Sequence, residues 1–427
     1  MADFIKKIWR NKELRKNLLI VLGILIVFRI MSHIPIPGVN LDALKKFFDS
    51  NEVFGLINVF SGGAMSQFSI VTLGVAPYIN ASIIMQLLTV VMPRLEALQK
   101  EGERGQFKIN QYTRYLTVPL AIVESYGFTL LLSRASGGEP IITSLSPFFL
   151  ISAVITMTAG TVLLMWLGEL ISERGVGNGL SLIIFSGIVA QIPQSIQQIY
   201  VNYNASQLLT IIGFAFLALA IIMGIVVITE GQRKIPVTYA KRVRGLKMYG
   251  GVSTHLPIRV TQAGVIPIIF AMSLMIFPEV IAKFLSNAKT EFIANTAKTV
   301  GSLFQTGTWF FSFFYFLLVV AFTYFYTSVI FKPDQVAENI QKQGGFIPGL
   351  RPGNQTSDYL RRVVNRITLA GAVFFGVVAV LPFIMQQFTG IKSLVIGGTG
   401  LLIVVSVAIE FMKQIEAQLV MKSYENY

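Results

Sequence analysis

The chain has 427 residues, of which 53% are hydrophobic and only 13% are charged, and it contains no cysteine. One water-soluble core does not accommodate so apolar a composition at this length, so the apolar stretches must face lipid or each other. The lack of cysteine excludes disulfide bonds and leaves the redox compartment undetermined. The net charge of +14 suits orientation in a membrane and contact with anionic lipids.

Long apolar runs follow one another along almost the whole chain. A helix that crosses the hydrocarbon core of a bilayer needs about 20 apolar residues. The runs lie at 17–36, 71–92, 114–133, 148–170, 180–199, 208–229, 262–285, 308–331, 366–388 and 393–413. The first follows basic residues as in a signal peptide, but no small-residue cleavage site comes after it, so we expect a retained helix. The pattern predicts an all-α polytopic membrane protein with ten transmembrane helices.

The distribution of Lys and Arg predicts how these helices are oriented. Ten spans place both termini on one side, and short loops rich in positive charge stay in the cytoplasm. With both termini cytoplasmic, 27 of the 35 basic residues lie on the cytoplasmic side, seven lie outside, and Arg29 lies within a span. We therefore expect a multi-pass protein of the cell membrane with both termini in the cytoplasm.

A short breaker sequence occurs twice, at corresponding places. Gly-Val-x-Pro opens the second helix at Gly74 and Pro77 and the seventh at Gly264 and Pro267. Glycine clusters at Gly175, Gly177, Gly179 and at Gly397, Gly398, Gly400 open the fifth and tenth helices. Unrelated kinks are the alternative, because Gly and Pro are common in membrane helices. Two agreeing pairs favour a repeat.

This repeat divides the chain into halves, 1–200 and 201–427. Five helices per half is an odd number, so the second half must be inverted relative to the first. In inverted-repeat membrane proteins, interrupted helices at equivalent positions mark the place where a substrate passes.

Residues after the breakers are aliphatic rather than polar. Val75 and Ile79 share one face of a helix, Leu180 and Ile184 repeat that spacing, and Ile269 follows Pro267 as Ile79 follows Pro77. These side chains either form a ring between four helices or occupy ordinary packing positions.

Charged groups that would hold a solute or ion at mid-membrane are few. Arg29 and His33 are predicted in the outer half of the first helix, and Glu169 and Glu410 near cytoplasmic ends. Only Glu124 lies deep, where a paired or water-exposed structural role is favoured over ion coupling.

Two basic cytoplasmic loops, about 230–261 and 332–366, carry features of folded docking surfaces. The alternation at Ile235, Val237 and Tyr239 and the later sequence LPIRV predict a hairpin. In the second loop, Asp334 is expected to cap a short helix that stops at Gly344, followed by an extended IPGLRPG segment. The chain has no phosphate-binding Gly-Lys-Ser/Thr loop and only two histidines, so we expect no cofactor, no metal site and no enzymatic activity.

Seven ordered blocks carry a resemblance to a known family. They are FRIMSHIPIPGV at 28–39, FSGGAMSQFSIVTLGVAPYINASIIMQLL at 60–88, ISERGVGNGLSLIIFSGIVA at 171–190, EGQRKIPVTYAKR at 230–242, QAGVIPIIFA at 262–271, GGFIPGLRPG at 344–353 and GGTGLLIVV at 397–405. Along nearly its whole length the chain resembles the SecY family, the channel-forming subunits of the bacterial Sec protein translocon. The resemblance implies two inverted five-helix halves around a central hourglass pore, with a short plug helix.

The resemblance also implies roles for particular residues. The pore ring would be Val75, Ile79, Leu180, Ile184, Ile269 and Ile403. The plug would be Phe60, Ser61, Gly62, Gly63, Ala64, Met65, Ser66, Gln67, Phe68, Ser69 and Ile70. The helices with the breakers Gly74, Pro77, Gly264 and Pro267 would be the faces of a lateral gate. Residues for partner docking would be Arg233, Lys241, Arg242, Arg244, Lys247 and Arg351.

The implied function is a passive protein-conducting channel. It would pass unfolded secretory polypeptides and release hydrophobic segments sideways into the cytoplasmic membrane. Implied partners are SecE-like and SecG-like small membrane subunits, the SecA motor ATPase, the ribosome, signal sequences and nascent polypeptides, and anionic lipids. An inverted-repeat secondary solute transporter is the alternative. The chain departs from the family pattern at Val75 and Leu180, where Ile is common, at Gly400, where Ser is frequent, and in its tail MKSYENY.

Overall fold

Among the residues that the computed structural model describes, ten long helices dominate, and each of the ten predicted apolar runs overlaps one of them. The structure describes residues 6, 8–50, 54–55, 57–58, 61–134, 140–142, 145–201, 208–239, 242–244, 247–249, 253–262, 264–285, 290–305, 307–389 and 393–425. The long helices are α2 (Lys12–Met31), α5 (Ala76–Val91), α7 (Glu103–Arg134), α8 (Pro147–Glu173), α9 (Gly179–Val201), α10 (Leu208–Glu230), α11 (Ile266–Leu285), α13 (Trp309–Ile330), α15 (Asn354–Thr389) and α16 (Ser393–Glu425).

Several of these helices are long and apolar enough to cross a membrane. Four such stretches lie within the described residues, at Glu103–Ser133, Pro147–Glu173, Trp309–Lys342 and Asn354–Gln387. A fifth counts if α5 and the short α6 (Pro93–Lys100), which are bent by 98° at Pro93, form one broken span. The chain is therefore a multi-span helical membrane protein. Helices α7 and α15 begin well before the apolar runs predicted at 114 and 366, because polar helix-forming residues extend them beyond the apolar layer.

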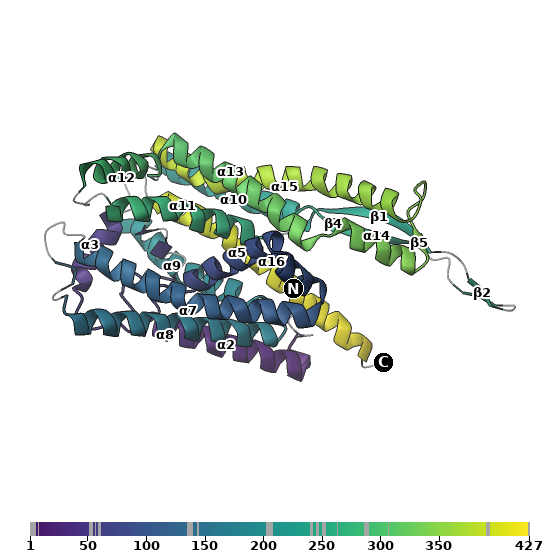
Figure 1. Ribbon diagram of the computed structural model, residues 1–427, viewed down its shortest axis with the longest axis horizontal. Helices are drawn as coiled ribbons and strands as arrows, with labels where there is room; N and C mark the ends of the chain where they lie inside the picture. Colours follow the sequence, from purple (N-terminus) through teal and green to yellow (C-terminus); the bar gives the residue numbers. More distant parts are fainter. Residues whose placement is uncertain are drawn as a thin grey trace.

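Short elements lie at the two ends of the bundle. Helices α3 (Leu41–Ser50) and α12 (Glu291–Leu303) lie at one end, and α14 (Pro333–Lys342) lies at the other end with the strands (Figure 1). The strands are β1 (Gln232–Tyr239), β2 (Arg242–Arg244), β3 (Lys247–Tyr249), β4 (Ser253–Arg259) and β5 (Gly345–Phe346). They form a three-stranded sheet in the order β4-β1-β5 and a separate β2-β3 pair. Both predicted docking loops therefore carry folded structure at the same end of the molecule.

The predicted hairpin is confirmed, since β1 and β4 pair antiparallel with Ile235 opposite Leu256. Ile235 and Val237 are buried against α14 and α15, while the intervening residues face outward. The cap predicted at Asp334 is wrong. Lys332 holds the N-cap position of α14, and the Asp334 carboxylate instead accepts hydrogen bonds from Ser357 and Arg361 of α15.

The segment after Gly344, predicted to be extended, is also different. Only Gly345 and Phe346 are extended, as β5, because they pair with the end of β1. Turns follow at 348–349 and 352–353, with a bend at Leu350, and Gly349 and Gly353 have positive φ angles of 82° and 99°. Arg351 is presented from this turn rather than from an extended strand.

Helix packing follows the same pattern in two groups. In the first group, α7 packs on α5 and α8, α8 packs on α9, and α2 packs on α8 and α9. In the second group, α13 packs on α11 and α15, α15 packs on α16, and α10 packs on α15 and α16. The two groups meet where α9 packs on α16 and α5 packs on α11. Figure 1 shows the first group in purple and blue and the second in green and yellow, with α16 running obliquely towards the first.

Candidate functional site

Both Gly-Val-x-Pro sequences have the same backbone conformation. Gly74 has φ of +57° and Gly264 has φ of +59°, in the left-handed region that favours glycine. Two residues later α5 begins at Ala76 and α11 at Ile266, so each proline is the second helical residue. Proline suits this position, because the amide hydrogen it lacks would have no partner within the helix. The breakers thus fix matched starts for the two helices that meet between the groups.

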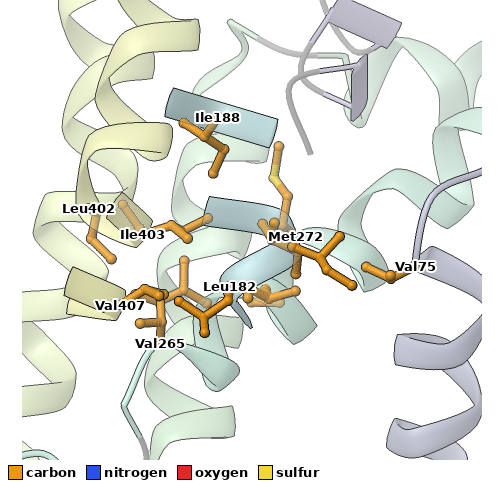
Figure 2. Close-up of a cluster of buried hydrophobic side chains, with 14 of the residues drawn as sticks. Val75, Leu182, Ile188, Val265, Met272, Leu402, Ile403 and Val407 are labelled. Atoms are coloured by element: carbon orange, nitrogen blue, oxygen red, sulfur yellow. The ribbon is translucent and has the colours of Figure 1, made fainter. Parts of the chain in front are cut away.

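Aliphatic side chains from four elements converge beside these helix starts. Val75 precedes α5, Ile184 lies on α9, Ile269 on α11 and Ile403 on α16, with exposed fractions of 4%, 4%, 8% and 1%. All four belong to one buried hydrophobic cluster. Figure 2 shows labelled members of that cluster from separate parts of the chain, with Met272 lying between Val75 on one side and Ile403 on the other. The structure therefore brings together four of the six residues predicted for the ring.

The remaining two predicted ring residues, Ile79 and Leu180, are only partly buried and pack against the cluster. Leu180 also packs closely against Gly168 of α8, because a Cβ atom placed at Gly168 would lie 2.9 Å from the Leu180 Cδ2 atom. Leu182 is more deeply buried than Leu180, at 4% exposure. Sequence spacing did not single out Leu182 or Met272, because nothing distinguishes them from other apolar residues of their helices.

A small cavity of about 60 Å³ opens within this cluster. Its walls come from α5, α9 and α11 and from the chain before α5, and they are mostly apolar. The lining residues are Ile57, Ser61, Leu73, Val75, Ala76, Ile79, Ile184, Ile269, Met272 and Ser273. Such a cavity disfavours hydration, because its aliphatic walls offer water few polar partners beyond the hydroxyl groups of Ser61 and Ser273.

Residues 61–68, predicted as part of a plug helix, form consecutive turns instead of a helix, followed by a β-bridge at Ser69. Phe60 lies outside the described residues. Phe68 is fully buried, has a positive φ of 45° and stacks on Phe128 of α7. Its carbonyl accepts a hydrogen bond of 2.9 Å from the Ile36 amide. A glycine-rich sequence with several small residues favours such turns over a helix.

Close backbone approaches position this turn segment against α8 and α9. A Cβ added at Gly160 of α8 would lie 1.9 Å from the Ile70 oxygen, and one added at Gly187 of α9 would lie 2.8 Å from the Gly62 Cα. Neither glycine was predicted from the sequence to have this role. A glycine inside an apolar helix usually indicates close packing against a neighbouring backbone, and this pattern could have pointed to both residues.

The second pair of glycine clusters does not match. Gly175 and Gly177 have positive φ values before α9, whereas Gly397, Gly398 and Gly400 lie inside α16, which begins at Ser393. The repeat prediction is wrong for these clusters. The similarity between the two helix groups therefore rests on the two Gly-Val-x-Pro sequences and on the shared helix-packing pattern.

Several of the buried charged groups have polar partners. Glu124 accepts a 2.8 Å hydrogen bond from the Asn80 amide, which links α7 to α5; this pairing is one of the two structural roles predicted for the carboxylate, paired or water-exposed. Arg114 and Glu169 form a 2.6 Å salt bridge between α7 and α8. Among the described residues no group of three or more metal-ligating side chains occurs.

The predicted docking residues lie at the strand end of the molecule. Arg233 on β1 and Arg351 in the turn after β5 are both exposed. Arg242, Arg244 and Lys247 lie in the β2-β3 pair, where Arg244 is opposite Lys247. Lys241 lies outside the described residues. The structure thus groups the described docking positions at one end, well away from α3 and α12 (Figure 1).

Comparison with known proteins gives one consistent family. The SecY family model matches residues 69–412. The chain is 44% identical over 450 residues to the protein translocase subunit SecY of Mycobacterium tuberculosis strain H37Rv, covering 100% of this chain and 99% of that protein. It is 43% identical over 445 residues to the corresponding Streptomyces galbus protein, covering 100% of both.

Solved structures with the same fold include a protein-conducting channel, with a TM-score of 0.64 and 18% identity over 94% of this chain and 91% of that one. A SecY protein whose plug domain stabilises the closed state of the translocation channel and maintains a membrane seal has a TM-score of 0.61 and 18% identity, over 93% and 91%. Sec61 in the canine ribosome-channel complex from the endoplasmic reticulum has a TM-score of 0.61 and 17% identity, over 94% and 91%.

Proposed function

Because the chain belongs to the SecY family, we propose that it is the central subunit of a protein-conducting channel. It passes unfolded secretory polypeptides across the cytoplasmic membrane and releases hydrophobic segments sideways into the lipid. The channel is a passive pore and carries out no catalysis. Energy comes from an external motor or from the ribosome.

One observation carries this proposal: the buried aliphatic cluster lies where the two helix groups meet, with members from α5, α9, α11 and α16. The groups correspond to an N-terminal half, 1–200, and a C-terminal half, 201–427. Their shared packing pattern and the matched helix starts at Gly74 and Gly264 support two inverted halves. All ten long helices then span the membrane around an hourglass pore.

The ring Val75, Ile79, Leu180, Ile184, Ile269 and Ile403 forms the waist of this pore. A pore for chains of any sequence must not offer fixed polar partners, because these would hold some substrates and reject others. Aliphatic side chains fit around many shapes, and in the closed state they make a dewetted constriction that resists ions. Residues 60–70 act as the plug, and the Ser61 side of that segment reaches the cavity within the ring.

Helices α5 and α11 are the faces of the lateral gate. Their starts at Gly74, Pro77, Gly264 and Pro267 end the regular helix at the pore waist, so the pair parts without breaking continuous helices. A sufficiently apolar segment of the nascent chain then leaves the pore sideways, because lipid solvates it better than a wet pore does.

Partners dock at the strand end, which lies in the cytoplasm together with both termini. Arg233, Lys241, Arg242, Arg244, Lys247 and Arg351 contact the ribosome and a SecA motor ATPase, since exposed arginines suit RNA phosphates and acidic protein grooves. SecE-like and SecG-like small membrane subunits pack on the bundle, and anionic lipids contact its basic loops. The solute-transporter alternative receives no support from the relatives or the solved structures.

Reconstitution tests the proposal directly. The chain is assembled with its small membrane subunits in liposomes, and a motor ATPase, ATP and a signal-bearing precursor are added. We expect the precursor to become protected from external protease, and only with ATP and an intact signal. Protection that is independent of the chain, or uptake of small solutes without polypeptide transport, would contradict the proposal.

A further inference from the structure

Arg29 is a charged residue at an unfavourable place. It lies near the end of α2 in the first apolar run, and its side chain is half-buried. A guanidinium within a membrane span is costly unless a partner satisfies it. Arg29 forms no ion pair with any residue that the structure describes. Its Nη1 instead donates a hydrogen bond of 2.5 Å to the carbonyl oxygen of Gly62.

Gly62 belongs to the turn segment 61–69, here called the plug segment, and α9 also contacts that segment. The backbones of Gly62 and Gly187 touch, because a Cβ added to either residue would lie 2.8 Å from the Cα of the other. Gln191, one turn further along α9, donates a 3.1 Å hydrogen bond to the carbonyl oxygen of Asn58. The Asn58 side chain in turn accepts a 2.9 Å bond from the Ser66 amide.

The plug segment is therefore clamped between α2 and α9, and the two attachments differ in strength. A charge-assisted hydrogen bond is stronger than a neutral one, and low local polarity strengthens it further. Opening the channel requires the segment to leave the ring cavity that Ser61 lines. The bond from Arg29 must break in that step.

We propose that Arg29 is a positioning residue that latches the plug segment in the closed channel through the Gly62 carbonyl, with Gln191 as a weaker second attachment. This inference rests on the proposed function, since it names the residues that hold the proposed plug. It assigns a role to the charge of Arg29 that neither membrane orientation nor contact with lipid headgroups requires.

Arg29→Met tests the latch, because methionine keeps a long side chain, removes all donors and suits an apolar surrounding. Purified channel complex is placed in planar bilayers without motor or substrate, and the ion conductance is measured. We expect closed-channel conductance to rise about tenfold, as loss of a charged hydrogen bond predicts, and to rise less for Gln191→Met. Ser32→Ala is the matched control, because Ser32 bonds the Arg29 carbonyl oxygen and not the plug segment; we expect no change.

A second readout follows the segment itself, using the absence of native cysteine. A single cysteine in place of Ser66 is labelled with a small thiol reagent in otherwise wild-type and in Arg29→Met channels. We expect faster labelling with Arg29→Met and an unchanged rate with Ser32→Ala. An unchanged labelling rate together with unchanged conductance in Arg29→Met would overturn the latch.

Transport by the wild-type protein in the same preparation distinguishes a failure of the latch from a failure of the proposed function. If it transports a signal-bearing precursor with a motor and ATP, while Arg29→Met neither leaks nor exposes the cysteine at position 66, only the latch is wrong. If wild-type channels transport no precursor, the proposed function fails, and the latch fails with it.

Discussion

The two places where the helix groups meet differ in how firmly they are joined. On one side α9 and α16 pack extensively, and the Gln418 amide donates a 2.6 Å hydrogen bond to the Gly175 carbonyl oxygen. On the other side α5 and α11 touch over a shorter stretch and enclose the ring cavity. Beyond that cavity the described link is a 3.4 Å hydrogen bond from Lys332 to Gln99.

This difference assigns mechanical roles to the two contacts. An extensive contact resists separation because many dispersion contacts are lost together, whereas a contact over a short stretch loses few. Motion between the groups is therefore expected to open the α5–α11 side and to pivot about the α9–α16 side. Hinge motion of this kind moves rigid bodies about a small set of residues.

The largest expected effect comes from tethering the gate. Cysteines in place of Ala76 and Ser273, which line the same cavity from α5 and α11, are joined by a short bifunctional thiol reagent. Motor-driven translocation should fall by more than about tenfold, because the two rigid groups can no longer part. Transport is measured as protease protection of a precursor in liposomes.

The control tether spans the other contact. Ser181 of α9 and Gln414 of α16 line one pocket, so the same reagent joins cysteines at these positions. We expect less than about a twofold loss of transport, since a pivot keeps its residues together. Equal inhibition by both tethers would break the distinction between gate and pivot.

A second prediction concerns the seal beside the gate. Ile269→Asn places an amide in the apolar ring, where Ile269 is 8% exposed. The polar group hydrates the constriction, so the ion conductance of the closed channel should rise about tenfold or more. Transport should also depend less on a strong signal sequence. Bilayer conductance and transport of precursors with weakened signals measure the two effects.

Ile269→Leu is the matched control, because it keeps the size and the apolar character of the side chain. It should leave both conductance and signal requirement close to wild type. If Ile269→Asn leaves both unchanged as well, Ile269 is an ordinary packing residue and the waist lies elsewhere.

Much of this architecture could be predicted from the sequence, because lipid imposes a simple length and polarity rule on helices. All ten apolar runs overlap long helices, and the β1–β4 hairpin follows from the alternation at Ile235 and Val237. The matched starts at Gly74 and Gly264 were also readable, since both depend on local backbone preferences of Gly and Pro.

What the sequence did not predict depends on tertiary contacts. The turns at 61–68 pack closely on Gly187 and the residue after the bridge, Ile70, packs on Gly160, both on distant helices, whereas a helix was expected there. Asp334 was expected to cap its own helix, but it bonds α15, because Ser357 and Arg361 lie within reach only in the fold. Leu182 entered the buried cluster more deeply than Leu180 through the orientation of α9.

A third prediction separates docking from gating. Arg351 is exposed in the turn after β5, far from the helix contacts, and its side chain is free to meet a partner. Arg351→Glu should lower motor-driven translocation several-fold by reversing a charge at the interface, while closed-channel conductance stays at the wild-type value. Ribosome affinity should also fall steeply with salt.

Arg361→Glu is the comparison for that experiment, because Arg361 is engaged with Asp334 within the fold. Unaltered transport by Arg351→Glu would remove Arg351 from the docking surface. Increased conductance by Arg351→Glu would show that the turn is coupled to the gate, and the two regions would then not be separable.

The smallest expected effects compare single hydrogen bonds on the two sides. Gln418→Met removes the short bond to Gly175 at the pivot, and Lys332→Met removes the long bond to Gln99 at the gate. We expect the free energy of unfolding to fall by about 1 kcal/mol for Gln418→Met and by less than about 0.5 kcal/mol for Lys332→Met, since short, well-formed hydrogen bonds contribute more. Unfolding by denaturant in the same detergent measures both changes in stability.

Lys332→Met should still raise the frequency of brief channel openings, because it weakens the α5–α11 side, which is expected to open. Gln418→Met should not raise this frequency. A reversed order of stabilities, or more openings with Gln418→Met than with Lys332→Met, would place the pivot at α5 and α11 instead.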